Sequence, residues 1–332
     1  MPLPELTPDY ALRFNYYHHS NFNYSPPSQK IFEKAVLRPM QNKLMEVIKD
    51  ESSSIEEKEA ARQRFTLLDT RLSMQPRMTA GIAVQTAADS VLGIDDKEPI
   101  KLEEAISTAK SEGLFFQPRT FFGKKCAEED ELLIGYFETI IGKVIEHAVL
   151  GLREAMAREN KYIGETIYEG RFPGNELPYQ TRPDYARRGD LKTQWPTLKK
   201  EKIDPENPNK PREFTNKTQS SLPKSLTDKF YKGNLRQVAG FWKLNGGLPP
   251  FLVYANQTNY KVFTPEDTPE LRDDYLEGVV EEMARENRAV EEILKAAKDQ
   301  EHLFKMLMPE WSRDLSWGYH PEVMRIARET LK

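Results

Sequence analysis

The clearest hydrophobic pattern in the chain lies between residues 128 and 160. Apolar side chains recur there at spacings of three and four residues, the spacing of one face of an α-helix. They are Leu133, Phe137, Ile140, Val144, Ala148, Leu152 and Met156. Ile141, Ile145 and Val149 widen the stripe, so we expect this central helix to be buried on more than one side. Three glycines within it indicate close approach of neighbouring helices: Gly135, Gly142 and Gly151.

Residues 28–112 carry weaker helical patterns with recognisable ends. Pro39 predicts a kink in the first helix of this region. Ser54 and Glu57 have the spacing of a capping box, which predicts a helix that starts there and continues to about Ser73. A small, apolar run from Met78 to Leu92 predicts a buried helix that ends at Gly93, and residues 102–109 predict another short helix.

The C-terminal third combines one hairpin with helices. Residues 251–254 and 260–263 are rich in strand-forming side chains and flank a short polar stretch, which predicts a small β-hairpin. Thr268 followed by Pro269 predicts the start of a helix that continues to about Leu307. His320 begins a last predicted helix, which ends near Leu331.

Two segments have no helical pattern of their own. Residues 1–27 and 171–235 are rich in proline and polar residues, and both are expected to be extended arms. The predicted fold is therefore mainly α, an irregular helical body with long extended proline-rich arms and one small β-hairpin. The expected divisions are an N-terminal arm (1–27), a helical domain (28–170), a basic proline-rich segment (171–235) and a hairpin followed by C-terminal helices (236–332).

Composition excludes several classes of protein. The 332 residues contain one cysteine, Cys126, so no intrachain disulfide can form. The first residues lack the basic and apolar regions of a secretory signal, no transit peptide is evident, and the most apolar stretch carries charges that disfavour a membrane span. We therefore expect an intracellular protein, in a compartment that the sequence does not specify.

Sequence motifs do not indicate a catalytic activity. The histidines lack metal-ligand spacing, no serine has the context of a nucleophile, and neither a metal nor a cofactor is predicted. Gly246 and Gly247 are interpreted as a turn. One alternative is a helical enzyme or small-ligand-binding protein with a pocket near these glycines, lined by Lys243, Asn245 and Tyr254.

The basic segment is the most distinctive feature. Residues 182–236 contain 14 Lys or Arg and 7 Asp or Glu, a net charge of +7 in a chain whose net charge is -4. Aromatic residues are interleaved, which is typical of a surface that binds an anionic partner. The predicted partner-binding residues, with two tyrosines of the N-terminal arm, are Arg182, Arg187, Arg188, Lys192, Trp195, Lys199, Lys200, Lys202, Phe230, Tyr231, Tyr16 and Tyr17.

These observations favour a non-catalytic structural or linker component of a large macromolecular assembly. Its extended basic and aromatic arms would bind other protein subunits of the complex, or RNA. An RNA-associated protein is a second alternative, and a segment that packs on the chain's own body or remains a solvated linker is also open.

Overall fold

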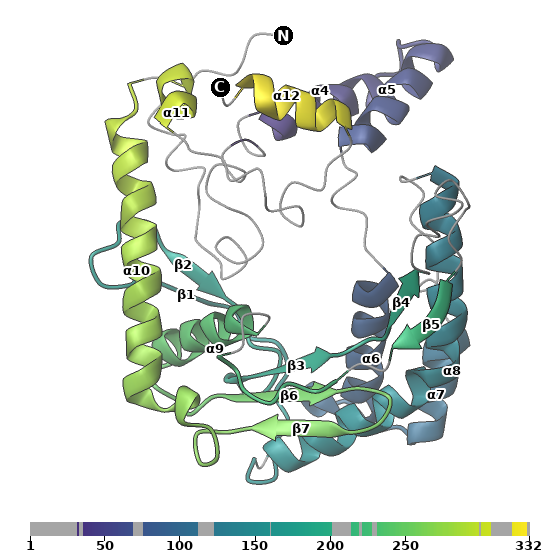
Figure 1. The fold of residues 1–332 in the computed structure, drawn as a ribbon, viewed down its shortest axis with the longest axis vertical. Helices are drawn as coiled ribbons and strands as arrows, with labels where there is room; N and C mark the ends of the chain where they lie inside the picture. Colours follow the sequence, from purple (N-terminus) through teal and green to yellow (C-terminus); the bar gives the residue numbers. More distant parts are fainter. Residues whose placement is uncertain are drawn as a thin grey trace, which may run out of the picture. The chain divides into compact units, whose positions relative to one another are not determined.

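The computed structural model describes residues 32, 36–68, 76–111, 123–159, 161–200, 214–218, 221–227, 231–298, 300–306 and 321–330. These residues are mainly helical (Figure 1), which confirms the expected fold class. The predicted N-terminal arm, residues 1–27, lies outside the described residues. The chain divides into two units, residues 1–73, 168–181 and 277–332 in the first and residues 74–167 and 182–276 in the second, and each is described by itself.

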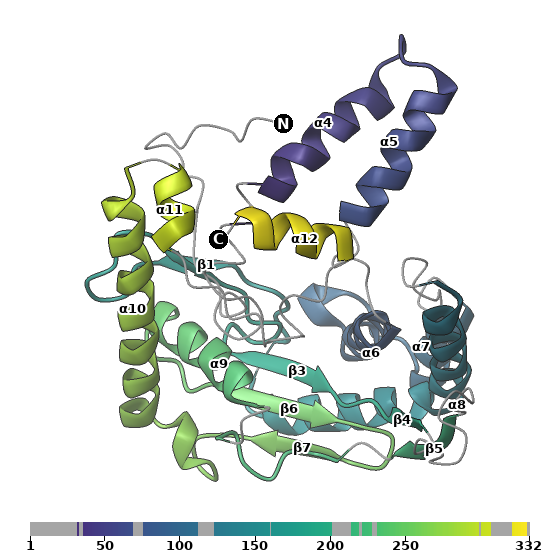
Figure 2. The same cartoon turned by 45° about the horizontal axis from the view of Figure 1, so that its top comes forward.

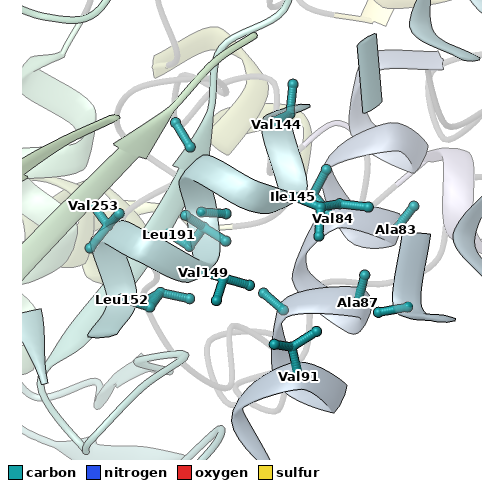
Figure 3. Close-up of a cluster of buried hydrophobic side chains, with 14 of the residues drawn as sticks. Ala83, Val84, Ala87, Val91, Val144, Ile145, Val149, Leu152, Leu191 and Val253 are labelled. Atoms are coloured by element: carbon teal, nitrogen blue, oxygen red, sulfur yellow. The ribbon is translucent and has the colours of Figure 1, made fainter. Parts of the chain in front are cut away.

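The predicted central helix is confirmed as α8 (Gly123–Ala155), the longest element of the second unit. It shares a core with α6 (Pro76–Leu92) and α7 (Leu102–Ser111). Figure 3 shows side chains of α6 facing those of α8, with Leu191 and Val253 on the other flank of α8. The wide apolar stripe is therefore explained by neighbours on two sides of the helix.

The glycines of α8 have different neighbours. A Cβ at Gly142 would lie 3.3 Å from Ile106 of α7, which is the close helix approach that the sequence predicts. A Cβ at Gly151 would lie 2.6 Å from the side chain of Val253, so this glycine allows the close approach of a strand rather than of a helix. No described atom lies within 4 Å of a Cβ at Gly135.

A three-stranded sheet of order β3-β6-β7 packs against α8. The predicted hairpin is confirmed as β6 (Phe251–Ala255) and β7 (Tyr260–Phe263), which pair antiparallel. Strand β3 (Gly189–Thr193) was not predicted, and it pairs parallel with β6 as an edge strand of the sheet. Helix α9 (Lys232–Leu244) lies alongside β3 and β6 (Figure 2).

The basic segment also contributes a two-stranded ribbon. Strands β4 (Thr197–Lys200) and β5 (Phe214–Thr218) pair antiparallel, with an irregularity in register between Lys199 and Lys200. The residues between these strands lie outside the described part of the chain. Part of the predicted extended segment is thus organised as β-strands.

In the first unit, α4 (Arg38–Lys49) and α5 (Ile55–Leu68) are neighbouring helices. Pro39 lies in the first turn of α4, and Val36 and Leu37 just before that helix are π-helical, so the helical hydrogen bonding changes close to the predicted kink. The predicted capping box is confirmed, because the Ser54 amide donates to Glu57 Oε2 at 2.8 Å and the Glu57 amide donates to Ser54 Oγ at 3.1 Å. The predicted last helix is present as α12 (Pro321–Thr330).

The long C-terminal helix starts later than the sequence predicts. Thr268 makes no side-chain cap, and Pro269–Leu271 forms the short 3-10 helix η4. Helix α10 (Asp273–Ala296) follows, and α11 (Gln300–Met306) is a separate element. The prediction of one helix from Thr268 to about Leu307 is therefore wrong, because the backbone is extended at Arg272.

Helix α10 is joined to the hairpin of β1 (Tyr168–Gly170) and β2 (Tyr179–Thr181) by buried polar contacts. The Glu291 carboxylate accepts hydrogen bonds from the backbone amides of Glu176 and Leu177 at 3.0–3.1 Å. Asn175 Nδ2 donates to the carbonyl of Ala284 at 3.0 Å. These contacts pair the polar groups of the hairpin loop with one face of the helix.

In the described part of the chain, no helix is both long enough and apolar enough to cross a bilayer. The sequence analysis likewise predicts no membrane-spanning helix.

Candidate functional site

The structure places the beginning of the basic segment on the chain's own body. The Trp195 side chain is buried, its ring centroid lies 4.6 Å from that of Phe137, and its Nε1 donates to Thr193 Oγ1 at 2.9 Å. Arg188 pairs with Glu159 at 2.8 Å and donates to a backbone carbonyl. For these two predicted partner-binding residues, the self-packed alternative is the one that the contacts support.

The other predicted partner-binding residues occupy varied environments. Arg182 forms an exposed ion pair with Glu165, and Arg187 is exposed. The ring of Tyr231 meets that of Tyr254 edge-on at 5.6 Å. Lys199 and Lys200 belong to β4. Four residues lie outside the described part of the chain: Tyr16, Tyr17, Lys202 and Phe230. Their role as partner contacts stays a prediction.

The turn predicted at the paired glycines is present, since Gly246 and Gly247 both have positive φ angles, 85° and 84°. The polar groups of the alternative pocket are engaged within the chain. Asn245 Nδ2 donates to the carbonyl of Arg187 at 3.0 Å, and its Oδ1 accepts the amide of Leu248 at 3.0 Å. These contacts fix a loop rather than line a pocket.

Two carboxyl groups lie together beside this loop. Asp190 is the second residue of β3 and is only 1% exposed, while Asp184 is half-buried in the loop that precedes the strand. The backbone amides of Asp184 and Tyr185 both donate to the carbonyl of Gly189, at 2.9 and 3.1 Å, and this turns the loop back on the start of the strand. Two acidic residues six positions apart are thereby brought side by side.

The pair carries an unfavourable accumulation of negative charge. Burial, the charge of Asp190 and a hydrogen bond between the two carboxyl groups raise the pKa of Asp184 well above its usual range. Lys192 and the backbone amide of Leu191 act in the opposite direction. A further cation beside the pair would relieve this repulsion.

Lys192 supplies the positive charge of the cluster. Its Nζ forms an ion pair with Asp190 Oδ2, and its side chain is 25% exposed. Strand residues alternate between the two faces of a sheet, and Leu191 lies in the apolar core. Asp190 and Lys192 consequently share the opposite face, which we call the polar face of β3.

Helix α9 covers the polar face of β3. At one end, Asn234 Nδ2 donates to the hydroxyl of Tyr254 at 2.6 Å, and Tyr254 is the residue that pairs with Lys192. At the other end, Asn245 is bonded to Arg187. The start of the helix is therefore bonded to the residue paired with Lys192, and the residue after its end is bonded to the loop that precedes β3.

Gln237 is a further buried polar residue of α9. It lies three residues after Asn234 and therefore on the same side of the helix, about 4–5 Å further along. Its side chain is 6% exposed, and its Oε1 accepts no hydrogen bond from any described residue.

The two carboxyl groups are of the ligand type that hard divalent cations prefer. Among the described residues there is no group of three or more His, Cys, Asp or Glu that could hold a metal, so a closed site made of side chains alone is not formed. Mg²⁺ needs fewer protein ligands, because it is bound through one or two carboxylates and completes its shell with water and substrate phosphate. Asp184 and Asp190 supply two carboxylates.

The sequence analysis missed both acidic residues. Asp184 and Asp190 fall within the basic segment, where they were counted only as part of its charge, and Lys192 was assigned to partner binding. The sequence did contain a signal: an acidic, an apolar and a basic residue follow one another at Asp190, Leu191 and Lys192. Side chains alternate between the two faces of a strand, so Asp190 and Lys192 would lie on the same face. That signal depends on β3, which the sequence analysis did not predict.

Comparison of the chain with models of protein families, with curated proteins and with solved structures finds no match. The proposed function therefore rests on the geometry of these residues.

A further buried acid lies next to the site. The hydroxyl of Tyr185 donates a hydrogen bond of 2.7 Å to Asp89 Oδ1 of α6. Burial raises the pKa of Asp89 to about 6, although this hydrogen bond and the charge of Lys97 lower it. Asp95 and Glu165 raise it further. The neutral form of Asp89 is thus favoured by folding.

We expect the free energy of unfolding to decrease as the pH rises from about 4 to about 7 in the presence of a chelator. Because the folded-state pKa of Asp89 is the higher one, its favourable contribution is full below the unfolded pKa and is lost as the pH passes about 6. The loss is on the order of 2 kcal/mol. Urea denaturation at the two pH values measures it. In Asp89→Asn, which is uncharged throughout, the contribution of Asp89 should be absent and the decrease correspondingly smaller, although the raised pKa of Asp184 still contributes to it. An unchanged decrease would contradict the assignment.

Proposed function

We propose that this protein is a divalent-cation-dependent nuclease, an enzyme that hydrolyses phosphodiester bonds in nucleic acid. The observation that carries the proposal is the pairing of Asp184 with Asp190 next to Lys192. Buried carboxylates that repel one another are unfavourable for folding, and such groups are concentrated at functional sites. A cation bound between them would reduce the repulsion.

The residues of the site have complementary roles in this reaction. Asp184 and Asp190 would bind the cation, which polarises a phosphoryl oxygen and activates water. Lys192 would stabilise the negative charge that develops on the phosphate. The water oxygen forms a bond to phosphorus, the bond from phosphorus to the leaving ester oxygen breaks, and a proton from the water passes to the leaving group. One phosphodiester and one water thereby give a phosphate monoester and an alcohol.

The charge distribution favours a polyanionic substrate. Residues 182–236, which include the site, carry a net charge of +7, whereas the rest of the chain carries -11. Positive charge around a site concentrates nucleic acid and makes its binding dependent on salt. Lys192 is partly exposed and Arg187 is exposed, so basic groups next to the carboxyl pair are accessible to a substrate.

Asp190→Asn is expected to weaken Mn²⁺ binding at least tenfold. The substitution keeps the size of the side chain but removes one of the two charges that attract the cation. Isothermal titration calorimetry of the full chain with Mn²⁺ and with Mg²⁺, at about pH 7.5 and low salt, measures the change.

Glu138→Gln is the matched control, because Glu138 is an exposed acid of α8. This substitution removes one negative charge at a position outside the site and should leave the affinity for Mn²⁺ and Mg²⁺ unchanged. Equal cation affinity in the wild type, Asp190→Asn and Glu138→Gln would contradict a cation site at the carboxyl pair.

Cleavage assays then test the substrate class. Linear duplex DNA, single-stranded DNA and RNA are incubated with the protein and Mg²⁺, and parallel samples contain a chelator. Shortened products that require Mg²⁺ and are absent with Asp190→Asn would support the proposal. Bound but intact nucleic acid, without Mg²⁺ dependence, would instead favour the assembly component or RNA-associated protein that the basic segment predicts.

A further inference from the structure

The loop that joins the two carboxyl groups has a backbone conformation that most residues avoid. Ala186 and Arg187 have φ angles of 49° and 62°, in the left-handed region. Strain of this kind persists only where surrounding contacts impose it. The contacts around this loop therefore determine how Asp184 is presented to Asp190.

Backbone contacts account for part of this restraint. The amide of Ala186 donates to the carbonyl of Ile163 at 2.8 Å, and the carbonyl of Arg187 accepts the bond from Asn245 at 3.0 Å. The amides of Asp184 and Tyr185 also donate to the carbonyl of Gly189, so the backbone of the turn is fixed at several points.

The side chain of Tyr185 adds a restraint outside the loop, and Tyr185 directly follows Asp184 in the chain. Its side chain is fully buried in the core that α6 and α8 share. Its hydroxyl reaches Asp89 Oδ1 at 2.7 Å, across a sequence separation of 96 residues. A tyrosine fixed at both its ring and its hydroxyl leaves little freedom to the residue before it.

We propose that Asp89 and Tyr185 are positioning residues of the cation site, and that their hydrogen bond holds the carboxyl group of Asp184 against Asp190. The inference rests on the proposed function, because it assigns these residues to the same cation. Neither side chain is assigned to the cation itself. Groups that orient metal ligands through hydrogen bonds commonly change metal affinity 10- to 100-fold when they are removed.

The test begins with Tyr185→Phe, which removes the hydroxyl and keeps the buried ring. Mn²⁺ affinity, measured by calorimetry on the full chain, is expected to fall about tenfold. Asp89→Val, which removes the acceptor, should weaken Mn²⁺ binding by a similar factor. The double variant should bind Mn²⁺ no more weakly than either single variant, because both changes break one interaction.

Two controls separate positioning from general stability. Asp89→Asn keeps an oxygen that can accept the hydrogen bond, so it should retain most of the wild-type affinity. Tyr260→Phe removes a comparable hydrogen bond, from the Tyr260 hydroxyl to Glu154 Oε2 at 2.9 Å, near the other end of the sheet. It should leave Mn²⁺ binding unchanged even if it lowers the melting temperature.

The outcomes distinguish this inference from the proposed function. Wild-type protein that binds no Mn²⁺ would overturn the proposed function and the positioning role with it. Wild-type binding together with equal binding by folded Tyr185→Phe would overturn only the positioning role. Loss of affinity in Tyr185→Phe and Asp89→Val, with recovery in Asp89→Asn, would establish it.

Discussion

Lys192→Met is expected to reduce the rate of nucleic acid cleavage about 100- to 1,000-fold while the protein still binds Mn²⁺. The methionine has nearly the same length and fills the same space but lacks the charge that would stabilise the reacting phosphate. Removing one such group from a preorganised site costs about 3–4 kcal/mol of transition-state stabilisation. The loss should fall on kcat, because the interaction strengthens as charge develops on the phosphate.

The separation of binding from catalysis makes this variant informative. Lys192 competes with a cation for Asp190, since its ammonium group already forms an ion pair with Oδ2. Mn²⁺ affinity in Lys192→Met should therefore equal or exceed that of the wild type. Steady-state cleavage at saturating Mg²⁺ and calorimetry on the same preparation measure the two properties.

Lys143→Met is the matched control, because Lys143 is an exposed residue of α8 that pairs with Glu146 on the same helix. It removes the same charge outside the site and should leave kcat within about twofold, in line with the small effect of surface pairs. If Lys192→Met cleaved as fast as Lys143→Met, Lys192 would have no part in the reaction. The carboxyl pair would then be a cation site without the proposed chemistry.

The parts of the fold that could be predicted from the sequence are those with local signals. The apolar period of α8 and the hairpin of β6 and β7 depend on residues that are close in the chain. The capping box of α5 depends on Ser54 and Glu57 alone, and both of its hydrogen bonds are present. Local rules determine these elements because their stabilising contacts form between near neighbours.

The elements that could not be predicted are fixed by distant contacts. Strand β3 has only Leu191 as a large apolar residue, and its parallel partner β6 starts about 60 residues later, so no local pattern reveals the pairing. The start of α10 is similar. Trp242 Nε1 donates to Asp273 Oδ1 at 2.9 Å, and this contact from α9 coincides with the first residue of the helix.

The candidate site was missed for the same reason. Asp184 and Asp190 are six residues apart, and this spacing does not by itself predict that their side chains are close. They come together only because the loop between them turns back on the strand. Lys192 is two residues further along and joins the pair only because β3 places it on the same face as Asp190. The excess of basic residues could be counted from the sequence alone. The pairing of the two acidic residues could not be predicted, because it depends on the edge strand β3.

Gly189→Ala is expected to destabilise the protein by about 3 kcal/mol or more, and to abolish the cation site. A Cβ at this position would overlap three carbon atoms of the Phe251 ring, which is fully buried. Gly189 and Phe251 are paired residues of β3 and β6, so the ring lies directly against the glycine backbone. Overpacking of this kind forces the backbone to shift, and Asp190 is the next residue of the strand. Urea denaturation measures the loss of stability.

The effect of the added methyl group should depend on position. At Gly135 of α8, where no described atom lies within 4 Å of a Cβ, the same change should stabilise the helix by up to about 1 kcal/mol. Combining Gly189→Ala with Phe251→Leu shortens the ring that the new Cβ meets, so part of the lost stability should return. If Gly189→Ala were as stable as Gly135→Ala, the contact between β3 and the Phe251 ring would be wrong. The placement of Asp190 on the polar face would then also be wrong, because the register of β3 against β6 determines both the Gly189–Phe251 contact and the face on which Asp190 lies.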